Sequence, residues 1–185
     1  NEILTTLINS FDMGNAFKNS IPIAIIGKPN AGKSTLFNAI INDERAIVSP
    51  ISGTTRDTIE EIVNINGIEY RFIDTAGVRK SEDPIEAEGI KRSYKSIESA
   101  NIIIYVCDVN DMNSSDAQLD LINIDKETSL KGKKIIIVAN KCDGNLSLKE
   151  IKKWQKIGAV KTIAKDKEGV DEIIKRITII SESSI

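Results

Sequence analysis

Residues 27–34 read Gly-Lys-Pro-Asn-Ala-Gly-Lys-Ser, which fits the GxxxxGKS pattern of a loop that wraps a phosphate group. The preceding residues, Ile21 to Ile26, form an apolar, β-branched run typical of a strand, and the apolar residues that follow the loop recur at helical intervals. Glycines let the backbone bend until several N–H groups face one anion, and the positive end of the helix dipole adds to the attraction. Taken alone, the loop could still be a glycine-rich turn with an accidental lysine. The residues predicted to contact the nucleotide here are Asn30, Ala31, Gly32, Lys33, Ser34 and Thr35.

Two of these residues have specific expected roles. The Lys33 ammonium should reach the β and γ phosphates, and the Ser34 hydroxyl should bind Mg²⁺. A second segment, Asp74-Thr75-Ala76-Gly77, follows the strand-like run that ends at Ile73. At the end of that strand, Asp74 can hold a water bound to Mg²⁺, while Gly77 lets a backbone N–H approach the γ phosphate. This second segment, in the expected order, makes an accidental first motif improbable.

A third segment, Asn140-Lys141-Cys142-Asp143, follows the apolar run from Lys134 to Ala139 and matches the NKxD motif. The Asp143 carboxylate can accept two hydrogen bonds from the N1–H and the exocyclic amine of guanine, whereas adenine offers no such pair. A wrong base would leave a polar group unpaired, so Asp143 is predicted to select GTP over ATP. Asn140 should tie the base loop to the phosphate loop, and Lys141 should lie along the base or the phosphate loop. Such a tetrapeptide is usually a solvated turn, but its position after a strand and downstream of the phosphate loop favours the guanine site.

Composition is consistent with one domain and limits its chemistry. The chain has 185 residues with 41% hydrophobic content, and 25 basic residues nearly balance 27 acidic ones. The near balance of charge predicts no direct nucleic-acid binding by this domain alone. No apolar stretch is long enough to span a bilayer, so we expect no membrane association. The absence of histidine excludes histidine general-base catalysis and the common zinc sites. Cys107 and Cys142 have no metal-like spacing and are expected to be reduced, packed thiols of a cytoplasmic protein.

Strands and helices alternate along the chain, which predicts an α/β fold with a mostly parallel six-stranded sheet, one antiparallel hairpin and helices on both faces. Asn66-Gly67 is the hairpin signal, because both positions tolerate positive φ. We predict a polar connection over residues 42–56. The predicted strands cover residues 21–26, 58–65, 68–73, 101–107, 134–139 and the neighbourhood of 160. The predicted helices follow the phosphate loop and cover residues 85–98, 114–130 and 170–180, with a further lysine-rich helical stretch around Trp154, whose side chain is expected to be partly exposed.

Residues ahead of the first strand carry a helix-like apolar pattern of their own, from Ile3 to Phe17. An amphipathic helix outside the core predicts that residues 1–19 are the edge of a neighbouring helical domain. The alternative is a terminal helix that packs on its own domain. The remaining residues, 20–182, form the predicted P-loop domain.

Four segments together resemble the G domain of the MnmE (TrmE) tRNA-modification GTPases. The segments are residues 27–38, Gly53-Thr54-Thr55-Arg56-Asp57, Asp74 to Arg79, and Ile85 to Ser93. GTTRD and DTAGVR are also typical of the Der and Era type of ribosome-assembly GTPase, so that family is the alternative. The spacing of Glu86, Gly89-Ile90 and Arg92, and the Gly14-Asn15-Ala16 segment, are more specific for MnmE.

The resemblance implies a Ras-like P-loop NTPase G domain inside a larger protein that modifies wobble uridines of tRNA together with the flavoenzyme MnmG. It implies binding of GTP and GDP, hydrolysis of GTP, and a homodimer formed through two G domains in the GTP-bound or transition state. Relatives carry Ser-Ala-Lys or Ser-Ala-Arg in the last guanine-binding element, where this chain has Ile163-Ala164-Lys165. The Ala164 N–H is expected to meet guanine O6, but the serine hydroxyl that would brace the loop is missing, so base affinity is expected to be weaker.

The chain lacks the residue that orients the attacking water in Ras-like enzymes. Val78 stands directly after DTAG, where Ras-like enzymes have a glutamine, and an apolar side chain cannot orient water. The resemblance implies that Glu86 places the water through a bridging water, although Glu86 could equally be a solvated carboxylate of an acid-rich segment. Glu86, Lys33 and Gly77 are the predicted catalytic residues.

The resemblance also implies that K⁺ supplies the charge that an arginine finger provides elsewhere. Asn30 would give a side-chain oxygen, although Pro29-Asn30 is also an ordinary turn dipeptide. The segment from Ser49 to Thr54 would complete the cage with backbone carbonyls, including that of Ile51. Thr55 is the candidate for a second Mg²⁺ ligand beside Ser34 and Asp74, with Thr54 as its rival.

Overall fold

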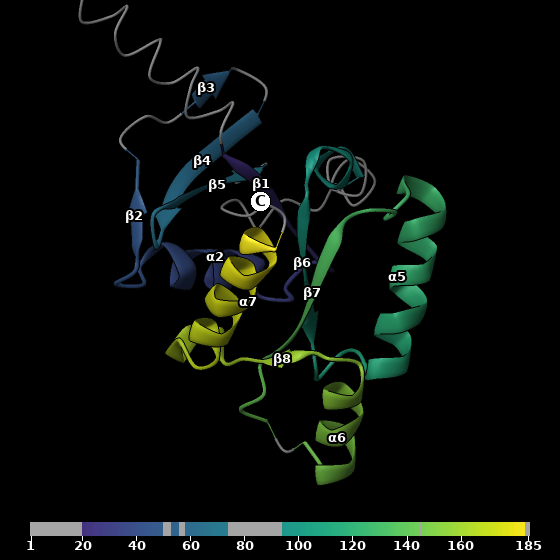
Figure 1. The fold of residues 1–185 in the computed structure, drawn as a ribbon. Helices are drawn as coiled ribbons and strands as arrows, with labels where there is room; N and C mark the ends of the chain where they lie inside the picture. The colour runs from purple at the N-terminus through teal and green to yellow at the C-terminus, as the bar shows by residue number, and fades with distance from the viewer. Residues whose placement is uncertain (1–19, 50–52, 56–57, 74–93, 145, 184–185) are drawn as a thin grey trace, which may run out of the picture.

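The computed structural model describes residues 20–49, 53–55, 58–73, 94–144 and 146–183, and the sheet of this part contains eight strands, two more than predicted. Seven strands lie in the order β2-β4-β5-β1-β6-β7-β8, and β3 pairs with β4 off this path (Figure 1). The strands are β1 (Ile21–Ile26), β2 (Ala46–Val48), β3 (Gly53–Thr55), β4 (Thr58–Ile65), β5 (Ile68–Ile73), β6 (Ile102–Asp108), β7 (Lys134–Asn140) and β8 (Val160–Lys161). The helices are α2 (Lys33–Ile41), α5 (Ser114–Thr128), α6 (Leu148–Lys156) and α7 (Val170–Glu182), with a short 3₁₀ helix, η1 (Ala164–Asp166).

Parallel and antiparallel pairing divide the sheet as expected. β5, β1, β6, β7 and β8 run parallel, while β2 and β3 both pair antiparallel with β4. The hairpin between β4 and β5 turns at Asn66 and Gly67, whose φ angles of 52° and 85° confirm the turn predicted from this dipeptide. The predicted polar connection over residues 42–56 was wrong at β2 and β3. β2 is a three-residue edge strand with Ile47 70% exposed, too short and too open to show a strand pattern in the sequence.

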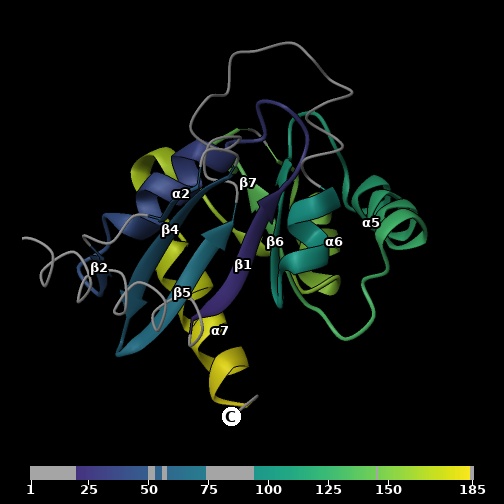
Figure 2. The same ribbon diagram turned by 90° about the horizontal axis from the view of Figure 1, so that it is seen from above.

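Helices cover both faces of the sheet, as Figure 2 shows: α2 and α7 lie on one side and α5 and α6 on the other. Each side has its own apolar cluster. Phe37 of α2 packs edge to face on Phe72 of β5, with ring centroids 5.2 Å apart, inside the cluster that also holds the buried residues of α7. The other cluster contains Tyr105 of β6 and Trp154 of α6. Residues 94–99 are helical, and the rest of the helix predicted over 85–98 lies outside the described residues.

Two buried tyrosines attach helices to opposite faces of the sheet. The Tyr70 hydroxyl of β5 donates to Ser181 Oγ of α7 at 3.0 Å, and the Tyr105 hydroxyl of β6 donates to Asp120 Oδ2 of α5 at 2.5 Å. Burial raises the pKa of both phenols, so both stay neutral donors. A hydroxyl that finds a partner lets an aromatic ring be buried without an unpaired polar group.

Trp154 is the clearest correction to the sequence analysis, because it is 2% exposed and not a surface packing residue. Helix α6 begins with a capping box, in which Ser147 accepts from the Glu150 N–H and the Glu150 carboxylate accepts from the Ser147 N–H. This start orients the helix so that Trp154 faces the sheet while the lysines face solvent. The lysine-rich composition concealed an amphipathic helix whose apolar side contains few residues.

Cys107 is buried and Cys142 is half-buried, and neither forms a disulfide, as predicted. Burial raises the pKa of the Cys107 thiol to about 12. Among the described residues, no helix combines the length and the apolar character needed to cross a membrane.

We expect Trp154→Ala to lower the free energy of unfolding by about 3 to 5 kcal/mol, because truncation of a buried aromatic leaves a cavity under α6. Urea denaturation followed by circular dichroism measures this change. Leu148→Ala is the matched control on the same helix: Leu148 is 78% exposed, so its truncation should change stability by less than about 0.5 kcal/mol. Equal losses in the two variants would contradict the packing described for Trp154.

Candidate functional site

Four loops meet at the carboxyl ends of the parallel strands. They are the phosphate loop after β1, the turn after β6, the loop over residues 140–143 after β7, and the loop over residues 162–165 after β8. Figure 2 shows the phosphate loop at the end of the sheet toward which β1 points. Ligands of open α/β sheets bind at this end, so the fold brings the phosphate and base motifs together.

The phosphate loop has room for glycine alone at both of its ends. Gly27 has φ +148°, and an added Cβ would lie 2.2 Å from the Val106 carbonyl oxygen of β6. Gly32 has φ +96°, and an added Cβ would lie 2.2 Å from Asn140 Nδ2. These contacts involve the backbone of a central strand and a buried amide, which cannot easily move. The two glycines therefore fix where the loop passes over the sheet.

The first turn of α2 presents the groups that an anion requires. Gly32 is the residue before the helix, and the first turn contains no acidic side chain. No carboxylate of this turn therefore competes with an anion for the backbone N–H groups. Lys33 Nζ donates to the carbonyl oxygens of Gly27 at 2.9 Å and Lys28 at 2.8 Å, which holds the ammonium inside the loop. Burial lowers the pKa of Lys33. Ser34 is half-buried and Thr35 is exposed on the same turn.

Asn140 joins the phosphate loop to both base loops and is 2% exposed. Its Nδ2 donates to the Ala31 carbonyl oxygen at 2.9 Å. Its Oδ1 accepts from Thr162 Oγ1 at 3.0 Å and from the Ala164 N–H at 3.1 Å. The link between the loops expected from the sequence is therefore present, and it also reaches the loop over residues 162–165. Thr162 was not singled out in the sequence; its hydroxyl braces this loop, one position before the missing serine.

Ala164 is already engaged by this network. Its N–H, expected to meet guanine O6, donates to Asn140 Oδ1, so O6 would have to share that N–H. Ala164 is buried, and it begins the short η1 helix with Lys165. Asn140 Oδ1 is thus the acceptor for the Ala164 N–H, which the sequence predicts to meet guanine O6.

Asp143 is exposed and its carboxylate forms an ion pair with Lys165. The hydrogen bond from Lys165 is the main reason that the pKa of Asp143 is lowered. An ionised carboxylate is the acceptor that guanine N1–H and the exocyclic amine need. In this chain Lys165 holds the carboxylate.

Asp108 is a site residue that the sequence analysis missed. It ends β6 opposite Asn140 in the register of β6 and β7, and its Oδ2 lies 2.6 Å from Lys141 Nζ. Asn110 donates its N–H and its Nδ2 to the other oxygen, at 2.9 and 3.0 Å. Burial alone would raise the pKa of Asp108, but the hydrogen bonds from Lys141 and Asn110 outweigh it and lower the pKa. Asp108 thereby fixes the direction of Lys141, whose backbone is in the left-handed region with φ +62°.

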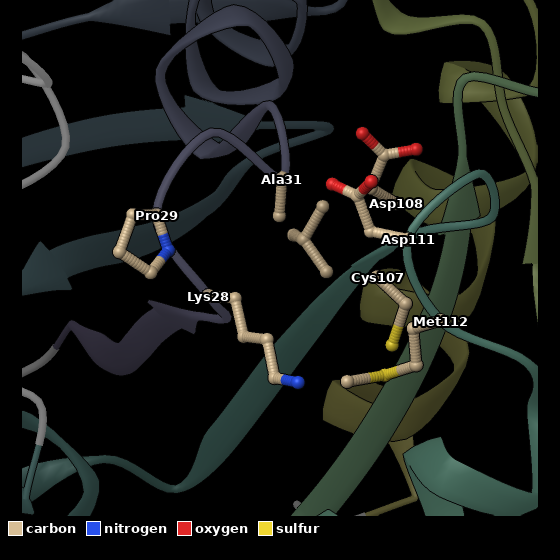
Figure 3. A pocket seen from close by; sticks show the side chains of 8 residues that line it. Lys28, Pro29, Ala31, Cys107, Asp108, Asp111 and Met112 are labelled. Carbon is tan, nitrogen blue, oxygen red and sulfur yellow. The ribbon is translucent and has the colours of Figure 1, made fainter.

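A small cavity of about 170 Å³ lies beside the phosphate loop, between that loop and the turn after β6. Figure 3 shows the Lys28 ammonium pointing toward the sulfur atoms of Cys107 and Met112, and the carboxylates of Asp108 and Asp111 near Ala31. Two carboxylates on its wall would repel a phosphate. The cavity therefore adjoins the predicted phosphate site and is not part of it.

The remaining predicted residues are only partly placed. Ser49 follows β2, and its N–H donates to the Ile62 carbonyl oxygen at 2.9 Å. Thr54 and Thr55 belong to β3, opposite Ile59 and Thr58 of β4. Asn30 is exposed in the phosphate loop with φ +61°. Ile51, Asp74, Gly77 and Glu86 lie outside the described residues.

No group of three or more histidine, cysteine or acidic side chains gathers as a metal site within the described ranges. The candidate Mg²⁺ ligands of the described part are hydroxyl oxygens, and hydroxyl and carboxylate oxygens are the ligands that Mg²⁺ prefers. Ser34, on the first turn of α2 beside Lys33, fits such a site.

We expect Asn140→Ala to lower the free energy of unfolding by about 2 to 4 kcal/mol, because it leaves the Ala31 carbonyl, the Thr162 hydroxyl and the Ala164 N–H without their buried partner. It should also weaken guanine-nucleotide binding, since both loops lose their link. Urea titration and calorimetry measure the two effects. Asn123→Ala, an exposed change on α5, is the control. A variant within about 0.5 kcal/mol of the wild type would contradict this role of Asn140.

Comparison with known proteins agrees with this geometry. The model of the family described as "50S ribosome-binding GTPase" matches residues 22–141. The chain is 50% identical over 143 residues to the tRNA modification GTPase MnmE of Parabacteroides distasonis, covering 77% of this chain and 30% of that protein. It is 44% identical over 173 residues to the MnmE of Flavobacterium psychrophilum, covering 92% of this chain and 37% of that protein. The chain thus spans about a third of the length of these curated relatives.

Solved structures support the fold. A crystal structure of Era in complex with MgGDPNP and a segment of 16S ribosomal RNA aligns with a TM-score of 0.59 at 24% identity, over 86% of this chain and 56% of that chain. The G domain of the Thermotoga maritima FeoB iron transporter aligns with a TM-score of 0.57 at 22% identity, over 88% of this chain and 99% of that chain. With the family model spanning the phosphate loop, the strands up to β7 and the first two residues of the NKxD motif, the chain belongs to the 50S ribosome-binding GTPase family and is a GTP-hydrolysing P-loop domain similar to that of the MnmE proteins.

Proposed function

We propose that this chain is the GTP-binding and GTP-hydrolysing domain of a cytoplasmic tRNA wobble-uridine modification GTPase. Identity of 44 to 50% to proteins named tRNA modification GTPase MnmE supports this assignment. The full protein would act on tRNA with MnmG, and two G domains would dimerise around their nucleotides. The chain spans only part of its relatives, so these partners belong to the proposal.

One observation carries the proposal: the buried Asn140 side chain holds the phosphate loop and the base loops in one hydrogen-bonded unit. In that unit the N–H groups at the start of α2 bind the phosphates, and Lys33 turns from the loop carbonyls to the β and γ phosphates. The Asp143 carboxylate accepts hydrogen bonds from guanine, which replace part of its ion pair with Lys165. Lys141, aligned by Asp108, lies along the base.

Ser34 would hold Mg²⁺, together with Asp74 and with Thr55, or Thr54 in its place. The ion would neutralise charge on the phosphate oxygens during transfer. The chain's own contribution is to orient the phosphates through the α2 N-terminus and Lys33, and to exclude other nucleotides through Asp143.

The proposed K⁺ site lies at Asn30, with carbonyl oxygens from Ser49, Ile51 and Thr54 closing around it when two G domains meet. The exposure of Asn30 supports this, because its side chain is available to an ion outside the loop. Glu86 would position the attacking water, and Gly77 would bring an N–H to the γ phosphate.

A ribosome-assembly GTPase of the Der or Era type is the second candidate. The description of the matched family, "50S ribosome-binding GTPase", is the observation that favours it. In that case nucleotide state would regulate docking on a ribosomal subunit, and hydrolysis would serve release.

Phosphate release from GTP, measured in KCl and in NaCl at equal ionic strength, tests the proposed mechanism. We expect faster hydrolysis in KCl by on the order of tenfold or more, since a cation at this place substitutes for an arginine finger that supplies about 10³ to 10⁵ in rate. Asn30→Ala should lose the K⁺ stimulation but keep GDP binding, whereas Asn38→Ala, exposed on α2, should keep both. Equal rates in the two salts would remove K⁺ from the mechanism.

A further inference from the structure

Four lysines form a stripe along helix α6. Lys149, Lys152, Lys153 and Lys156 are all exposed, and their spacing of three, one and three residues places them on one side of the helix. From the first to the last, the stripe extends about 10 Å along the helix axis. We call these four residues the α6 lysine stripe.

The opposite side of α6 faces the protein. Trp154 is buried there, and Ile157 packs against the same apolar cluster. The helix therefore has a fixed orientation, and its lysines point away from the core. A helix that binds a membrane surface needs its apolar side free to enter the lipid, and here the domain already covers that side.

The lysines of the stripe form no ion pair within the described part of the domain. In the part of the chain that the structure describes, no ion pair joins any of the four lysines to a carboxylate. The nearby Glu150 carboxylate is used by the Ser147 N–H and hydroxyl. Residues 148–167 contain seven lysines and two acidic residues, whereas the whole chain has a net charge of −2. Positive charge is thus concentrated in this segment of a chain that is slightly acidic overall.

We propose that the α6 lysine stripe binds the phosphate backbone of double-stranded RNA. Lysine ammonium groups act as point charges on phosphates without reading sequence, and several along one axis can follow a regular backbone. The described aromatic side chains are buried apart from the half-buried Tyr94, so the surface offers no platform on which single-stranded bases stack. Duplex RNA is recognised mainly through shape and phosphates, which suits this surface.

This proposal rests on the proposed function, because a tRNA modification enzyme meets RNA stems. It replaces the expectation, drawn from the nearly neutral total charge, that the domain alone does not bind nucleic acid. Total charge concealed the stripe, since acidic residues elsewhere balance the lysines.

The stripe is also connected to the nucleotide site. Helix α6 begins shortly after Asp143 and is followed by β8 and the loop over residues 162–165. The Cys142 N–H donates to the Thr162 carbonyl oxygen at 3.2 Å, so the two base loops that flank the α6 segment in the chain contact each other. RNA on the stripe would therefore lie on the segment that connects these two loops.

Fluorescence anisotropy with a labelled RNA hairpin, whose stem has about 16 base pairs, tests the proposal on this chain. The test variant carries Lys→Gln at the four stripe positions. The control variant carries Lys→Gln at Lys95, Lys126, Lys131 and Lys175, which are exposed on other elements and give the same change in net charge. We expect affinity at about 50 mM salt to fall by on the order of tenfold or more in the stripe variant and much less in the control. The dependence of log affinity on log salt should lose about three to four units of slope in the stripe variant.

A variant with Lys→Arg at the four stripe positions should restore binding, because it keeps the charge. No binding of the hairpin by the wild type at low salt, or equal losses in the stripe and control variants, would overturn the proposal. Displacement of the RNA by polyglutamate at lower concentration than by unlabelled hairpin would also overturn it, by pointing to an acidic protein as the partner. Titration of each sample with fluorescent GDP separates this proposal from the proposed function. Unchanged GDP binding by the stripe variant shows that its nucleotide site is folded. Failure of the wild type to bind GDP would instead contradict the proposed function.

Discussion

The side chain of Asn140 is the contact on which the functional end of the structure depends. One buried amide holds the Ala31 carbonyl of the phosphate loop and, through its oxygen, Thr162 and Ala164 of the last base loop. It also explains why Gly32 has no side chain, since a Cβ there would occupy the place of Asn140 Nδ2. Loops from three strands are therefore one unit, and the distance between a bound triphosphate and the base loop is set by the protein before the nucleotide arrives.

Around this unit, neighbouring residues of the protein hold the charged side chains of the site in place. Asp108 at the end of β6 aligns Lys141, and Lys165 aligns Asp143. The pKa of each aspartate is lowered, so both carboxylates are ionised near neutral pH. Lys33 is held by the carbonyls of its own loop in the same way. Lys33, Lys141 and Asp143 thus each have a protein partner, which the nucleotide must replace or share.

Local chemistry explains how much could be predicted from the sequence. The bounds of β1, β4 and β5 agree with the predicted strands because apolar runs there end at a glycine loop or at an Asn-Gly turn. β2 could not be predicted, since a three-residue edge strand depends on pairing with β4 and has no pattern of its own. The burial of Trp154 was missed for a related reason: neighbouring lysines dominate the composition of α6, while the packing partner is distant in the chain. In the site, motif spacing indicated the loops, but the pairing of Asp108 with Lys141 depends on the register of β6 and β7 and required the structure.

The central claim is that a phosphate loop and a guanine-selective carboxylate, joined through Asn140, form one nucleotide site. Calorimetric titration of this chain with GDP and with ADP in the presence of Mg²⁺ tests it most directly. We expect saturable binding of GDP and no measurable binding of ADP, since adenine cannot donate the two hydrogen bonds that the Asp143 carboxylate would accept from guanine. Equal affinity for the two nucleotides, or no heat with GDP, would contradict it.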